Sequence, residues 1–203
     1  MQSTVETALN KKLESVGTIL RAAGWFGFWL NLGFVAATSL MLMFAIAGRS
    51  FNQAVVNPVP GAPINPALPA TTPGMGIGIF WAVCSILALL FSVYLTYRQT
   101  RFAKRLQHAD TVAHPSRAEV TQLLRLGAIV GFIGMVFAVF GGMTTLSILL
   151  AKSLSQVQSV SVLDPSRTIR SLDIFVALAN MTGLTAHLIG TFASASLFEW
   201  LHR

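Results

Sequence analysis

Four long apolar stretches, separated by more polar segments, dominate the pattern of the chain. They cover residues 24–47, 75–97, 126–150 and 172–198. A helix needs roughly 20 apolar residues to cross the hydrocarbon core of a bilayer, and each stretch reaches that length. The pattern therefore predicts an all-α fold, an integral membrane bundle of four transmembrane helices that occupies residues 24–203 as one domain.

The segment before the first stretch has a different pattern. Within residues 1–23 apolar side chains recur at helical spacing, and Lys11 and Lys12 lie largely off that stripe. A helix of this kind typically lies in the membrane interface. We expect an amphipathic N-terminal interfacial segment over residues 1–23.

Composition agrees with a membrane protein. Hydrophobic residues make up 54% of the chain and charged residues 10%, and the mean hydropathy is +0.67. Soluble domains carry about 25% charged residues, so this class is excluded. The lipid bilayer is the expected partner.

The net charge of +7 is distributed unevenly. Of the 14 Lys and Arg residues, ten precede the first stretch, lie between the second and third, or follow the fourth. Positively charged residues favour the cytoplasmic side, so both termini are predicted to be cytoplasmic. No aromatic-interleaved basic motif accompanies the charge, and no nucleic-acid partner is expected.

Two connections carry local signals. Residues 57–74 hold six of the eight prolines, which predicts an extended external loop. Ser116 and Glu119 have the spacing of a capping box, which predicts a helix beginning there.

An internal repeat is a further hypothesis. "RSFNQAV" after the first stretch resembles "KSLSQVQ" after the third, and "IFWAVCS" in the second resembles "IFVALAN" in the fourth. Two tandem helical hairpins related by an axis along the membrane normal would explain both likenesses. In this alignment Ser92 occupies the position of His187.

Small residues form a stripe on the third stretch. Gly127, Gly131 and Gly134 lie at helical spacing. Such stripes let transmembrane helices approach closely, so we expect these three glycines to mediate helix packing and the third helix to be the central one.

His187 is an ionisable residue deep inside the fourth stretch. Asn180 and Thr191 share its helix face, and Asn31 on the first stretch could supply a facing polar wall. Two interpretations stay open. His187 fixes helix pairing through a hydrogen bond, or it lines a transport path with Asn180, Thr191 and Asn31 and binds a metal ion.

No catalytic signature accompanies this face. The chain contains no Walker sequence, HExxH, CxxC or paired intramembrane carboxylate, and its single Cys84 cannot form an internal disulfide. We therefore expect a protein that is not an enzyme and that has no cofactor.

Several longer segments resemble one known family. They are "GWFGFWLNLGF", "YRQTRFAKRL", "PSRAEVTQLLRLG", "LLAKSLSQ", "SLDIFVALAN" and "TAHLIGTFASASLFEWL". The family consists of four-helix membrane proteins of cyanobacteria and chloroplasts, and includes the inner-envelope protein called permease in chloroplasts, also described as a component of the import translocon. Asn180 and His187 match its pattern, whereas "FEWLHR" with Glu199 departs from it.

The resemblance implies a function of one of two classes. The first is a metal-ion permease or permease subunit, with iron as the transported ion, in a plasma or thylakoid membrane. The second is a non-transporting scaffold, assembly or accessory subunit of a larger photosynthetic or protein-translocation complex. Four helices enclose little space, so we expect a homo-oligomer or association with a larger membrane complex.

Overall fold

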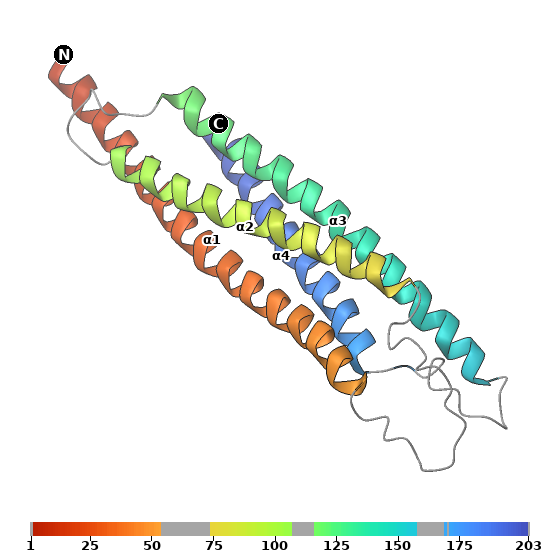
Figure 1. The fold of residues 1–203 in the computed structure, drawn as a ribbon. Coiled ribbons are helices and arrows are strands. Elements are labelled where there is room, and N and C mark those ends of the chain that lie inside the picture. Colours follow the sequence, from red (N-terminus) through yellow and green to blue (C-terminus); the bar gives the residue numbers. More distant parts are fainter. Residues whose placement is uncertain (1, 54–73, 107–115, 158–168, 170, 203) are drawn as a thin grey trace, which may run out of the picture. The chain divides into compact units, whose positions relative to one another are not determined.

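The computed structural model describes residues 2–53, 74–106, 116–157, 169 and 171–202. These residues form four helices and no strand: α1 (Gln2–Gln53), α2 (Met75–Leu106), α3 (Arg117–Val157) and α4 (Ser171–His202) (Figure 1). Each helix contains a segment long and apolar enough to cross a membrane. The expected all-α fold with four transmembrane helices is confirmed, and the protein is a multi-pass membrane protein.

The helices extend beyond the apolar stretches seen in the sequence. Helix α1 runs without a break from Gln2 to Gln53, so the segment expected over residues 1–23 and the first span belong to one helix. The placement of that segment at the membrane surface stays a prediction. The prolines of the stretch at 57–74 lie outside the described residues.

The start of α3 carries the predicted capping box. The backbone N–H of Glu119 donates to Ser116 Oγ at 3.2 Å, and the backbone N–H of Ser116 donates to Glu119 Oε2 at 2.9 Å. Two backbone donors at the helix start are thereby satisfied. This prediction is confirmed.

The chain divides into two compact units, and every helix contributes a segment to each. The first unit contains Met1–Val35, Leu87–Gly134 and Thr185–Arg203. The second unit contains Ala36–Ile86 and Met135–Leu184. Each unit therefore includes part of all four helices.

The first unit has a leucine-rich core at one end. Its members come from α1, α2 and α3 and are buried: Leu20, Leu95, Phe102, Ala103, Leu106, Val120, Leu123 and Leu124. Leu197 and Leu201 of α4 pack against them. We call this set the leucine cluster.

The second unit combines a small apolar core with aromatic contacts. Ala45, Met75 and Val176 are buried together. The ring of Trp81 lies 5.6 Å from the ring of Phe137 and 5.5 Å from that of Phe140, measured between centroids. These contacts join α2 to α3 within the unit.

The outward faces of the helices are apolar. Exposed large side chains occur on all four helices, among them Trp29, Phe80, Phe132 and Phe192. Such surfaces suit lipid contact. In its apolar window α4 is the most enclosed helix, with 44% of residues buried against 28% for α3. That α3 is the central helix of the bundle stays a prediction.

Helix contacts in the first unit match the proposed repeat only at the glycines. Their partners Thr100 and Ser194 are 94 positions apart, one fewer than the offset of "IFWAVCS" and "IFVALAN". A Cβ added at Gly24 would lie 2.8 Å from Thr100 Cγ2, and one at Gly127 would lie 3.1 Å from Ser194 Oγ. Gly24 and Gly127 are 103 positions apart, the offset of "RSFNQAV" and "KSLSQVQ". In each proposed hairpin a glycine of the first helix, α1 or α3, thus faces a small polar residue of the second helix, α2 or α4.

Candidate functional site

Three polar residues and one glycine lie near the middle of the helices in the first unit. Asn31, Ser92, Gly134 and His187 each lie near the centre of the span of their own helix. Side chains at such positions are remote from both membrane surfaces. We call these four residues the mid-span layer.

His187 of α4 packs directly against Gly134 of α3. The imidazole occupies the place where a Cβ at position 134 would lie, and His187 is only 1% exposed. The absence of a side chain at Gly134 is therefore what admits the ring. Gly127 and Gly131 face Ser194 and Thr191 in the same way. The structure thus places all three sequence-identified glycines on the α3 face that contacts α4.

Asn31 of α1 lies across from His187. Its side chain is 3% exposed, and its Oδ1 accepts no hydrogen bond from the described residues. On α4, a Cβ added at Gly190 would be 3.8 Å from that oxygen. A buried amide oxygen of this kind calls for a donor or a cation, because unsatisfied polar atoms are costly in an apolar interior.

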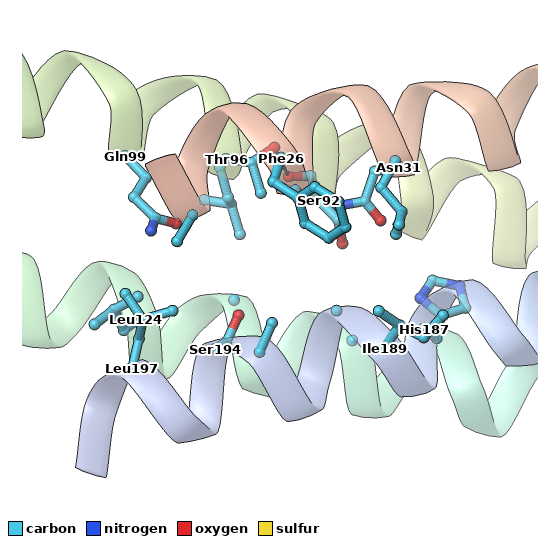
Figure 2. A pocket seen from close by; sticks show the side chains of 18 of the residues that line it. Phe26, Asn31, Ser92, Thr96, Gln99, Leu124, His187, Ile189, Ser194 and Leu197 are labelled. Atoms are coloured by element: carbon cyan, nitrogen blue, oxygen red, sulfur yellow. Dashed lines mark hydrogen bonds between the residues drawn. The ribbon is translucent and has the colours of Figure 1, made fainter. Parts of the chain in front are cut away.

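A cavity lies between these residues. It has a volume of about 110 Å³ and is lined by all four helices. One ordered water takes about 10 to 15 Å³ on the same measure, so several could fit. Figure 2 shows Asn31 and Ser92 on one side of the space and His187 and Ser194 on the other. Thr96 and Gln99 complete the polar part of the lining.

The other two sequence-identified path residues lie elsewhere. Thr191 packs onto Gly131 rather than lining the cavity. Asn180 belongs to the second unit, where its Nδ2 donates to Val176 O at 3.0 Å and to Gly78 O at 3.5 Å. The structure therefore brings His187 and Asn31 to one cavity and gives Thr191 and Asn180 packing positions.

His187 is the one ionisable residue among the described residues that line the cavity. Among the described lining residues there is no Asp, Glu, Lys, Arg or Cys. Within the described part of the chain no three His, Cys, Asp or Glu residues gather in a group that could hold a metal ion. A metal ion at His187 would have to complete its ligands with neutral oxygens such as Asn31 Oδ1, or with water.

The sequence patterns did not predict one buried ion pair. In the second unit Lys152 Nζ donates to Asp173 Oδ2 at 2.6 Å, and the side chains are 7% and 3% exposed. Both residues flank the connection between the third and fourth apolar stretches. An antiparallel hairpin brings these flanks together, and that signal could have revealed the pair.

Comparison with known proteins identifies a family. A family described as Protein of unknown function (DUF3611) matches residues 10–202. "Protein TIC 21, chloroplastic" of Arabidopsis thaliana is 28% identical over 195 residues, which cover 93% of this chain and 58% of that relative. The chain thus spans a little over half the length of this relative. No solved structure matches the chain.

These matches agree with the resemblance noted from the sequence segments. They extend over α1 to α4, because the matched region begins at residue 10 and ends at residue 202. The expectation of a family shared with a chloroplast membrane protein is confirmed. Since the family match covers nearly the whole chain, this protein belongs to the DUF3611 family of proteins of unknown function.

Proposed function

We propose that the protein is a permease, or the membrane subunit of one, whose cargo passes the mid-span layer. The observation that carries this proposal is the buried Oδ1 of Asn31, which faces a cavity and accepts no hydrogen bond from the described residues. Transporter sites commonly lie near the bilayer midplane between repeated halves. The protein acts without transforming its cargo chemically.

The cargo we propose is a metal cation, with iron as the specific expectation from the family resemblance. A neutral imidazole and an amide oxygen are both metal ligands, and His187 and Asn31 present them to one cavity. The lining has no carboxylate among the described residues, so the cation would be held weakly. Weak binding suits passage, because a conducted ion must leave as well as enter.

The geometry also bears on assembly and location. The cavity lies inside one unit and is closed at one end by Leu95, Leu123 and Leu124 of the leucine cluster. A continuous path would need movement of these residues or a second subunit. We propose a homo-oligomer or a larger complex, and the chloroplast relative favours a plasma or thylakoid membrane as its location.

The second candidate function is a non-transporting scaffold or assembly subunit. The observation that favours it is the close packing of His187 on Gly134, which fixes the ring between two helices. A structural histidine would show such packing. The resemblance noted from the sequence segments, to a family that includes a component of the import translocon, also favours a role in a larger complex.

Metal uptake into reconstituted vesicles separates the two functions. We expect His187→Ala to reduce iron uptake at least tenfold while the oligomer mass is unchanged. Leu188→Ala is the matched control, because Leu188 neighbours His187 but is 55% exposed on the outer face. Control vesicles should retain the wild-type uptake rate.

The opposite pattern would support the scaffold. In that case His187→Ala would lower the melting temperature while any flux per folded molecule persisted, because a buried partner left unsatisfied costs about 1 to 3 kcal/mol. Wild-type vesicles without metal flux, together with isolation of the protein in a large complex, would refute the permease proposal.

A further inference from the structure

The cavity of the first unit is open on one side. Its lining includes Phe26 of α1, which is 69% exposed, and Ile189 of α4, which is 37% exposed. Figure 2 shows these side chains on opposite sides of the space, one from each helix. Both belong to the apolar outer surface of helices that cross the membrane. The opening between α1 and α4 therefore leads into the bilayer.

The end of the cavity that points along the helices is closed. Leu95, Leu123 and Leu124 line it there, and all three belong to the buried leucine cluster. Phe102 and Leu106 lie behind them in the same cluster. Gln99 lines the same end, and its Nε2 donates to Leu20 O at 3.4 Å. A molecule arriving along the helices from that end thus meets packed side chains, whereas one dissolved in the bilayer meets the exposed Phe26 and Ile189.

The lining changes character from the mouth to the interior. Phe26, Ile189 and Ala193 at the outer side are apolar. Asn31 and Ser92 are further inside, and Asn31 Oδ1 is a buried acceptor that no described residue satisfies. Such a cavity matches a molecule with one polar end and one apolar end. The polar end must donate a hydrogen bond to fit Asn31.

We propose that this cavity binds a membrane-dissolved amphiphile, a single narrow apolar chain with an uncharged hydroxyl or amide head. The head enters between α1 and α4 and donates to Asn31 Oδ1, and the chain extends past Phe26 and Ile189 into the bilayer. A charged head is disfavoured because no described carboxylate, ammonium or guanidinium lines the site. This inference goes beyond transport and does not require it.

A photoactivatable fatty alcohol tests the site in the purified protein in lipid nanodiscs. Mass spectrometry of the labelled protein should locate adducts at Phe26, Leu30 and Ile189. Asn31→Leu should reduce this labelling about fivefold, the effect of one hydrogen bond. Ala193→Trp should abolish it by filling the mouth. The control Leu188→Trp introduces the same indole ring on the exposed face of α4 and should leave the labelling unchanged.

Competition in the wild-type protein gives an answer that does not depend on the folding of any variant. Unlabelled fatty alcohol should suppress adducts at Phe26 and Ile189, whereas an alkane of equal chain length should not. Adducts at Phe192 that the unlabelled alcohol suppresses as strongly as those at Phe26, or equal competition by the alkane, would overturn the proposal. The assay contains no metal and measures no flux, so its failure is distinguishable from a failure of the permease proposal.

Discussion

The two units use buried polar side chains in different ways. In the first unit Asn31, His187 and their neighbours surround a cavity. In the second unit Asn180 packs on Gly141 and donates to two backbone carbonyls, and Lys152 pairs with Asp173. Both units place a large polar side chain on a glycine of α3. The difference shows that a polar side chain of α4 packed on a glycine of α3 can either border a cavity or join helices by hydrogen bonds. Which of the two occurs depends on the residues that lie on the other side of the polar side chain.

The largest expected effect is in the second unit, at the ion pair. Lys152→Met should lower the free energy of unfolding by about 3 to 5 kcal/mol, because it leaves the Asp173 carboxylate buried without its ammonium partner. Thermal unfolding in mild detergent measures the loss. The double variant Lys152→Met/Asp173→Leu should recover most of the stability. A single variant as stable as the wild type would show that water reaches the pair.

Glycine substitutions compare the two units directly. Gly141→Ala should cost about 2 to 3 kcal/mol, because the added Cβ meets Asn180, which is held by hydrogen bonds. Gly134→Ala should cost less, about 1 to 2 kcal/mol, because the His187 ring can shift into the cavity. Melting temperatures of the two variants provide the measurement.

Gly33→Ala is the control for this pair. Gly33 lies in α1, and an added Cβ there meets nothing within 4 Å. Because alanine favours helix, the substitution should be neutral or stabilise the protein by up to about 1 kcal/mol. Equal costs at Gly134 and Gly141 would mean that the cavity gives His187 no freedom to move.

Removing polar atoms that accept no hydrogen bond should change the free energy of unfolding less, and should raise it rather than lower it. Thr38→Val in the second unit and Asn31→Leu in the first should be neutral or stabilising by up to about 1 kcal/mol, because Thr38 Oγ1 and Asn31 Oδ1 accept no hydrogen bond from described residues. Asn180→Leu should destabilise, since its Nδ2 donates to Val176 O. Chemical unfolding of the three variants gives the ranking. A loss of stability in Asn31→Leu would indicate that ordered water satisfies Asn31.

The last prediction has no stability effect and concerns orientation. The C-terminal end of α2, which belongs to the first unit, carries four basic residues: Arg98, Arg101, Lys104 and Arg105. The positive-inside rule therefore assigns this end of the helix to the cytoplasm. In a Cys84→Ser background, a cysteine at Arg101 should react only with reagent on the cytoplasmic side. A cysteine between Ala62 and Thr72 should react only from outside. Reversed labelling would invert the assignment.

The sequence predicted the helices better than it predicted the site. Long apolar stretches and the spacing of Ser116 and Glu119 are local signals, and the structure has the corresponding helices and cap. The cavity depends on which residues of four helices meet. Helical periodicity placed Asn180, His187 and Thr191 on one face, but it could not show that only His187 lines the space. The positions of Lys152 and Asp173 on either side of one connection were a sign of their pairing, but the contact itself depends on the register of α3 against α4.

The proposed repeat also relates the glycine contacts of α3 to positions in α1 and α2. By its offsets, Asn31 and Ser92 occupy the places of Gly134 and His187, and Thr38 and Ser85 occupy those of Gly141 and Asn180. In the second hairpin the large polar residues, His187 and Asn180, are on α4 and face glycines of α3. In the first hairpin the larger residues, Asn31 and Thr38, are on α1, and the corresponding residues of α2 are serines. Where His187 and Asn180 lie against Gly134 and Gly141, a large residue at either α3 position requires a smaller one at the facing α4 position.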